Sequence, residues 1–163
     1  MFMKKADNTT VEHLLGIFSS LLRLLPGESA ARIRTLAKFT EKKLEKVTKL
    51  LQLRAQYAAK VGAVDNEIKQ ERSQLGEDEA EERADEWFSR RLDGGLFCLQ
   101  TIDVILAWLV AEDAGAKQLI VKETGVDVIK RSLQEQLDGL SPNANEEEED
   151  IREMLGTLIS FLD

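Results

Sequence analysis

The long stretch between Pro26 and Pro142 contains no proline, and these are the two prolines of the 163-residue chain. A proline inside a helix removes a backbone hydrogen bond and clashes with the preceding turn, so this stretch is free to form long helices. Apolar residues recur every three to four positions, which is the spacing of one helix face. Segments that alternate apolar and polar residues, as strands do, are absent. The sequence therefore predicts an all-α fold.

The first forty residues predict two helices. Thr9 and Glu12 have the spacing of a capping box, in which each side chain accepts a hydrogen bond from the backbone N–H of the other. The helix that they begin is expected to end at Pro26-Gly27. Ser29 is then expected to cap a second, shorter helix.

A third helix is expected between Thr40, as its N-cap, and about Ser73. Its apolar positions form one stripe, and its length would reach roughly 50 Å. Arg54 and Asp65 interrupt the heptad seam that a dedicated coiled coil needs. We therefore expect residues 40–113 to form a long antiparallel helical hairpin.

The second helix of this hairpin is expected to begin in the acidic run after residue 77 and to become the central helix of the fold. Its segment Leu96–Val110 is the most apolar of the chain, but it is shorter than the ~20 residues that span a bilayer. Burial explains it better, and Trp87 and Trp108 are expected in the core. The Gly94-Gly95 pair inside it is expected either to permit close packing or to mark a kink.

The last fifty residues predict short helices near 117–123 and 126–137, then a loop and a final helix. The final helix is expected to start in the acidic run Glu146–Asp150, because acidic side chains complement the positive end of the helix dipole. No clean repeat of fixed period is present. The chain is therefore expected to be a single helical domain.

The charge of the chain is concentrated in two places. The net charge is −8, and the runs Glu77–Glu86 and Glu146–Asp150 contain most of the excess acid. Such patches disfavour nucleic acid and anionic membranes and attract basic peptides. One basic stretch exists, which we interpret as a solvated helix face rather than a phosphate-binding site, since no aromatic residues interleave it; its members are Lys38, Lys42, Lys43, Lys46, Lys49 and Arg54.

Catalytic or metal chemistry has few residues to use. His13 is the single histidine and is interpreted as structural, because it sits beside an apolar helix face. Cys98 is the single cysteine and is expected to be buried, with a raised pKa that makes it a poor nucleophile. Paired Glu-x-x-His ligands and glycine-rich phosphate loops are missing. We expect a protein that is not an enzyme and has no cofactor and no metal.

Several stretches resemble the C-terminal region of the β-catenin-like protein 1 family. The most specific is RRLDGGLFCLQ at Arg90–Gln100, which is similar to an Arg-Arg-Leu-Asp-x-Gly-Leu-Phe-x-Leu-Gln segment of that family. LLRLLPGESAARIRTLAKF at Leu21–Phe39 runs directly into TEKKLEKV at Thr40–Val47 in the same order as in the family. The start at Phe2-Met3-Lys4 and the acidic last helix are weaker matches. These are packing motifs, and none of them is catalytic.

The resemblance implies an armadillo-like α-solenoid in the nucleus, associated with the NineTeen complex of the spliceosome. It implies protein partners, namely splicing factors with basic nuclear-localisation-type segments, and neither nucleic acid nor membrane. The chain would be the C-terminal end of that solenoid. Its three expected regions are remnant repeat helices at 1–39, the helical hairpin at 40–113 and short C-terminal helices at 114–163.

A partner-binding face is expected near the start of the central helix, formed by Glu81, Glu82, Asp85 and Glu86, which share one side of a helix. The alternative is an independent oligomerisation module without peptide binding, in which the helix at 40–73 pairs between chains. If the chain is the end of a solenoid scaffold, it could also form a weak homodimer.

Overall fold

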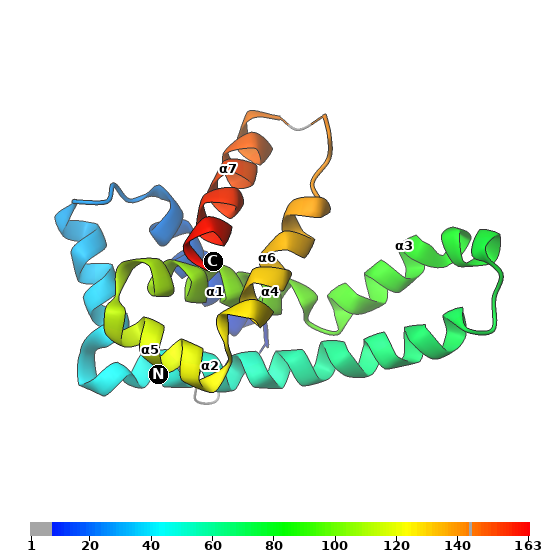
Figure 1. Cartoon of the computed structure of the whole chain (residues 1–163), viewed down its shortest axis with the longest axis horizontal. Helices are drawn as coiled ribbons and strands as arrows, with labels where there is room; N and C mark the ends of the chain where they lie inside the picture. The colour runs from blue at the N-terminus through cyan, green and yellow to red at the C-terminus, as the bar shows by residue number, and fades with distance from the viewer. Residues whose placement is uncertain (1–7, 144) are drawn as a thin grey trace.

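A computed structural model describes residues 8–143 and 145–163 of the chain. These residues form helices and contain no strand, which confirms the predicted all-α class (Figure 1). The predicted capping box at Thr9 involves a side chain outside the described part of the chain. The elements are α1 Asn8–Leu24, α2 Ala30–Arg72, α3 Glu77–Asp93, α4 Leu96–Glu112, α5 Ala114–Glu123, α6 Val126–Asp138 and α7 Glu146–Phe161.

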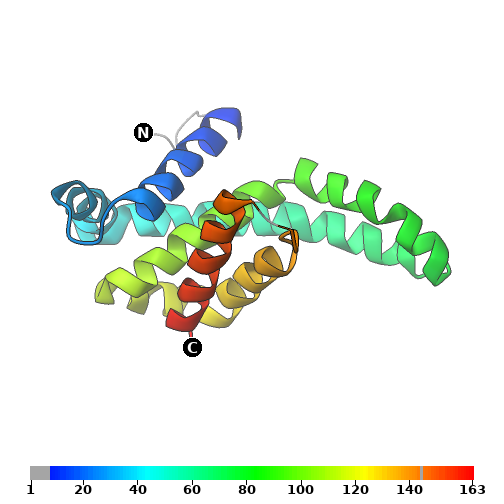
Figure 2. The ribbon, with the colours of Figure 1, turned by 90° about the horizontal axis from the view of Figure 1, so that it is seen from above.

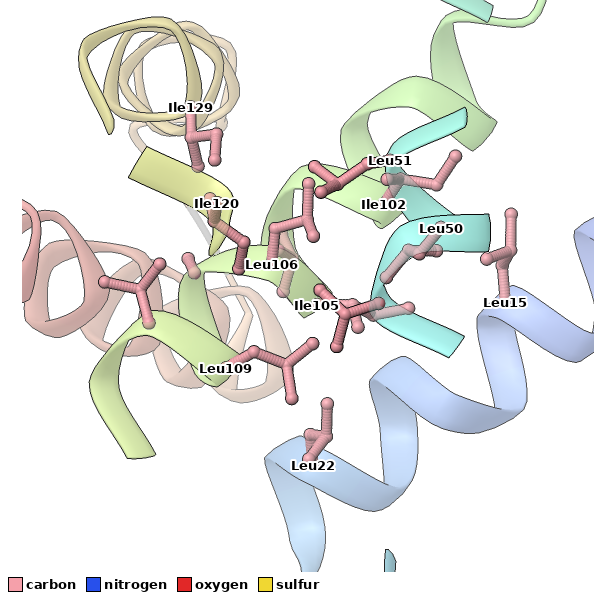
Figure 3. Packing of buried hydrophobic residues seen from close by; sticks show 14 of the residues in the cluster. Leu15, Leu22, Leu50, Leu51, Ile102, Ile105, Leu106, Leu109, Ile120 and Ile129 are labelled. Atoms are coloured by element: carbon pink, nitrogen blue, oxygen red, sulfur yellow. The ribbon is translucent and has the colours of Figure 1, made fainter. Parts of the chain in front are cut away.

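Helix α4 is the centre of the molecule. It contacts each of the other six helices, and most of its side chains are buried. Helix α1 lies on one side of it, and α6 and α7 lie on the other (Figure 2). Leucine and isoleucine side chains of α1, α2, α5 and α6 converge on α4 (Figure 3). Each buried side chain of this kind contributes about 1.5–3 kcal/mol, so the most apolar segment of the sequence organises the core.

Helix α2 is broken near its beginning. Ser29 caps it as expected, because its hydroxyl accepts a hydrogen bond from the Arg32 N–H at 3.1 Å. The backbone at Glu41 is extended, and the residues 42–44 that follow have positive φ. The prediction of separate helices before and after residue 40 is therefore correct. The proposed cap is wrong, since the Thr40 hydroxyl donates back to carbonyls of the preceding turn.

The expected continuous central helix is two helices. Helices α3 and α4 meet at a bend of 66°. Gly95 lies in the bend with φ of 103°, a conformation that residues with a side chain rarely adopt. A Cβ atom at this position would lie 2.5 Å from Cδ1 of Tyr57 in α2. Gly95 therefore serves both expected purposes, since it permits close packing against α2 and allows the change of direction.

Two buried arginines tie the helices together. Arg54 of α2 donates to the Asp103 carboxylate of α4 with an Nε–Oδ1 distance of 2.5 Å, and Asp103 is fully buried. Arg54 is thus part of the core and not of the basic surface expected from the sequence. Arg32 forms a bidentate pair with Glu112 at 2.9 and 2.7 Å and also donates to the Leu25 carbonyl. It connects the start of α2 to the end of α4 and to the turn after α1.

Polar side chains cap the starts of α5 and α7, and glycines flank α6. Asp113 caps α5 through a 2.7 Å hydrogen bond from the Ala116 N–H. Gly125 separates α5 from α6, as predicted. Asn145 caps α7 by accepting from the Glu148 N–H at 2.9 Å, and the acidic run fills the first turn of that helix. These local signals agree with the short helices that the sequence predicts.

Candidate protein interface

Helix α3 and the distal half of α2 form an arm that projects from the helices around α4 (Figure 1). The two helices run antiparallel, with the turn after Arg72 at the tip of the arm. Helix α3 begins in the acidic run, with Glu77, Asp78 and Glu79 in its first turn. The arm therefore presents an acidic helix at a distance from the main core.

The arm is held together by Trp87. Its side chain is buried, and its Nε1–H donates to Oε2 of Glu71 in α2 at 2.8 Å. The guanidinium groups of Arg72 and Arg83 lie 5.0 and 5.6 Å from the centre of its ring, within cation–π range. Hydrogen bonds lower the pKa of Glu71, with the larger effect from Arg90 and a smaller one from Trp87. The expectation that Trp87 packs inside the fold is confirmed.

The expected partner-binding acids lie on α3. Glu81, Glu82, Asp85 and Glu86 are all exposed. They belong to the arm and not to the central helix, because the bend at Gly95 separates α3 from α4. Glu86 is engaged by Arg83 at 3.0 Å, and three of the four carboxylates remain directed at solvent without an ion pair in the described part of the chain.

A groove runs along the arm between α2 and α3. It has a volume of about 390 Å³ and an apolar floor that includes Ile68, Ala84 and Trp87. Phe88 borders the groove, and its side chain is 50% exposed. From the apolar pattern of the sequence, Phe88 would be expected to face the core. Sequence reasoning missed this groove. The sequence feature that could have predicted it is the combination of apolar and acidic residues within the short segment that forms α3.

A second, larger groove lies on α1. It has a volume of about 790 Å³ and is lined by α1 and by Phe97 of α4. Ile17 is 55% exposed and Leu24 is 69% exposed, so the apolar face of α1 is only partly covered. His13 lines this groove and is exposed, so it lies on the surface beside an apolar face.

The basic stretch and the reactive side chains have different surroundings. Lysines 38, 42 and 43 are exposed. Cys98 is buried, as expected, and burial raises the pKa of its thiol. Burial also raises the pKa of the neighbouring Tyr57 to about 12. Within residues 8–143 and 145–163, no three His, Cys, Asp or Glu side chains gather in a way that would hold a metal ion.

Across the part of the chain that the structure describes, no single helix is long and apolar enough to cross a membrane. The bent pair of α3 and α4 passes by length and composition alone, and most of α4 is buried in the fold.

The described residues form an all-helical fold with exposed grooves and a projecting charged arm, which is consistent with a segment of an α-solenoid interaction scaffold. The chain belongs to the catenin-beta-like, Arm-motif containing nuclear family, whose model matches residues 1–160. This match confirms the family resemblance and the armadillo-type class, and it agrees with the predicted nuclear localisation.

Three relatives illustrate the match. The beta-catenin-like protein 1 homolog of Schizosaccharomyces pombe is 35% identical over 112 residues, which cover 69% of this chain and 19% of that protein. Beta-catenin-like protein 1 of Rattus norvegicus and that of Homo sapiens are each 33% identical over 165 residues, covering 92% of this chain and 28% of each relative. The chain thus spans less than a third of the length of these curated relatives.

Proposed function

We propose that this chain is a non-catalytic scaffold segment that captures basic, nuclear-localisation-type segments of splicing factors in the NineTeen complex of the spliceosome. The observation that carries the proposal is the acidic face of α3, displayed on an arm away from the core. Exposed carboxylates on a rigid helix attract lysine and arginine side chains and speed their association. Glu81, Glu82 and Asp85 are the main contacts, and Glu86 contributes while it holds Arg83 in place.

We further propose that the chain forms the C-terminal end of a longer armadillo solenoid. The exposed apolar face of α1 supports this, because each repeat of a solenoid buries its apolar face against its neighbour. The length of the relatives leaves room for such neighbours. The proposed regions are residues 1–39, 40–113 and 114–163. The non-helical residues 41–44 and the extended backbone at Asp113 lie near these proposed boundaries and support them.

A non-catalytic role agrees with the surroundings of the reactive groups. The thiol of Cys98 is buried with a raised pKa, which makes it a weak nucleophile. His13 is the single histidine and lines the exposed α1 groove, whereas Cys98 is buried. No cofactor is part of the proposed function.

The alternative function is oligomerisation through the helix at 40–73. Much of the apolar stripe of that helix is buried inside its own chain, where Leu50 and Leu51 pack against α4 (Figure 3). Pairing between chains would have to use another surface, so this function has less support. A weak homodimer through the α1 groove stays compatible with the scaffold role.

The test is the fluorescence anisotropy of a labelled peptide of lysine, arginine and glycine, titrated with the chain at low and at physiological salt. We expect salt-sensitive binding, since the contacts are between exposed charges. The triple variant Glu81→Lys, Glu82→Lys and Asp85→Lys is expected to weaken it by roughly tenfold or more.

A matched control reverses three other exposed acids, with Glu28→Lys, Glu123→Lys and Glu153→Lys. This variant has the same net charge as the arm variant. If the control weakens binding as much as the arm variant does, attraction depends on total charge alone and the arm is not the site. Absence of binding at high protein concentration would refute peptide capture by this chain.

A further inference from the structure

The groove on the arm has properties that a purely basic peptide does not use. Ile68, Ala84 and Trp87 form its floor, and half of the Phe88 side chain is exposed at its border. Solvated lysine and arginine heads would leave this apolar strip in contact with water, which is unfavourable in proportion to its area.

The two sides of the groove have opposite charges. Lys69 and Arg72 of α2 line one edge, and both are exposed. On α3, the exposed carboxylates of Glu81 and Asp85 lie seven and three residues before Phe88, so helical spacing puts them just beyond the groove on the α3 side. Arg91 also borders the groove, but Asp65 and Glu135 neutralise it at 2.8 and 2.7 Å. The arm groove therefore has apolar lining at Ile68, Ala84, Trp87 and Phe88, cations of α2 along one side, and exposed carboxylates of α3 just beyond the other.

We propose that the arm groove binds an amphipathic helix with one basic and one acidic flank. A leucine-sized side chain of that helix enters the groove over Ala84 and contacts Phe88. Its basic flank faces Glu81 and Asp85, and its acidic flank faces Lys69 and Arg72. This inference rests on the proposed function, because it specifies which kind of basic segment the arm selects.

A helix fits this surface better than an extended basic segment. An extended basic segment can pair with the carboxylates of α3, but cations that entered the groove would lie near Lys69 and Arg72, and like charges repel at close range. A helix separates its flanks by its own diameter of about 10 Å, so it can satisfy both sides while its apolar face covers the groove. The opposite charges of the two sides also set the direction in which the helix lies.

The test uses two labelled helical peptides of identical charge. In the first peptide, a leucine and further leucines four and seven residues after it form the apolar face. Lysines lie along one flank of this face and glutamates along the other. In the second, alanines replace the leucines. We expect the leucine peptide to bind the chain roughly tenfold or more tightly than the alanine peptide, because an apolar anchor commonly dominates such contacts.

Two variants locate the binding. Phe88→Ala removes the exposed border of the groove, and Ala84→Gln fills the groove with a neutral side chain; neither residue belongs to the buried core. Each is expected to abolish the advantage of the leucine peptide. Phe161→Ala is the matched control, because Phe161 is 55% exposed on α7 and should leave both peptides unaffected. Circular dichroism of each variant checks that the arm is still helical.

The outcomes separate this inference from the function on which it rests. If the basic glycine peptide binds but leucine and alanine peptides bind equally, the scaffold proposal stands and the amphipathic partner is refuted. If no peptide binds, both are refuted. Sedimentation that shows self-association lost in Phe88→Ala, without binding of the leucine peptide, would assign the groove to a second copy and also overturn the inference.

Discussion

At the scale of single residues, the pair of Arg54 and Asp103 shows how a charge becomes part of a core. Asp103 follows the apolar pattern of α4 and is fully buried, while Arg54 is 9% exposed. Burial raises the pKa of Asp103, and the hydrogen bond from Arg54 opposes that rise. The arginine thereby stabilises the carboxylate in an apolar environment, although both groups lose their hydration.

Breaking this ion pair should be worse than replacing it. Asp103→Ala leaves the Arg54 guanidinium buried and unpaired, so we expect a loss of about 3–5 kcal/mol in the free energy of unfolding. The combination of Arg54→Met with Asp103→Leu should stay within about 1–2 kcal/mol of the parent chain, because no unpaired charge remains. Urea unfolding followed by circular dichroism measures both. A single variant that is no less stable than the double variant would contradict this account.

The single tyrosine offers a direct spectroscopic test of burial. Desolvation raises the pKa of Tyr57 from 10.0 to about 12. Ultraviolet absorbance of tyrosinate should therefore show a midpoint near pH 12 in the folded chain and near pH 10 in urea. Because the folded state holds this proton more tightly, its stabilising effect is complete below pH 10 and is lost as the pH rises through 12.

A rise in pKa from 10.0 to about 12 corresponds to roughly 2.8 kcal/mol without solvent screening, so with screening the loss should be on the order of 2 kcal/mol. Tyr57→Phe is the control, because it keeps the ring and removes the titrating group. Its urea midpoint should change less between pH 10 and 12 than that of the parent chain. A tyrosinate midpoint near 10 in the folded chain would mean that the hydroxyl is solvated.

At the scale of elements, the junction of α3 and α4 decides the shape of the molecule. The bend of 66° directs α3 away from the core and creates the arm. The same backbone position lets Tyr57 approach the chain closely. A continuous helix from residue 77 to 109, as the apolar pattern predicts, would keep the direction of α4 and could not turn by 66° at Gly95.

Two glycine substitutions should therefore have opposite effects. Gly95→Ala places a methyl group against the Tyr57 ring and forces a side chain into positive φ, so we expect a loss of at least about 2 kcal/mol. Gly62→Ala lies in a helix interior with no atom within 4 Å of the added methyl group. It should stabilise the chain by about 1 kcal/mol.

Thermal unfolding of the two variants measures this contrast. Both substitutions add one methyl group to the chain, so a general effect of volume or hydrophobicity would change their stability in the same direction. Equal transition temperatures for Gly95→Ala and the parent chain would show that the bend does not depend on the glycine.

At the scale of the whole molecule, the exposed apolar face of α1 governs how the chain behaves alone. Ile17 and Leu24 are more than half exposed in the described structure. Single exposed apolar residues are ordinary, but a continuous groove of this kind usually marks a contact surface. The isolated chain should therefore bind apolar dyes through α1.

Leu24→Lys combined with Ile17→Lys should reduce that dye fluorescence strongly. Stability should change by less than about 1 kcal/mol, because both side chains are exposed in the folded state. The control is Val121→Lys on α5, where a 47% exposed valine lies outside the groove. Dye binding that responds equally to both variants would show that the α1 groove is not the dominant apolar surface.

The sequence by itself determined the elements that depend on local physics. The absence of proline between residues 26 and 142, the cap at Ser29 and the break at Gly125 predicted helices that the structure contains. The family resemblance in the Arg90–Gln100 segment was also readable, because packing motifs retain their order along the chain. These features are local, since backbone hydrogen bonding and capping involve residues a few positions apart.

Only the tertiary structure decided which side chains face water. Phe88 is apolar and would be expected in the core, but its ring is half exposed. Arg54 is charged and would be expected at the surface, but it is buried. Helical spacing predicts that apolar residues share a face, but not which neighbour covers that face. The direction of α3 after the bend, and the packing of α2 against α4, settle that question. The grooves on the arm and on α1 follow from that arrangement and therefore could not be derived from the sequence.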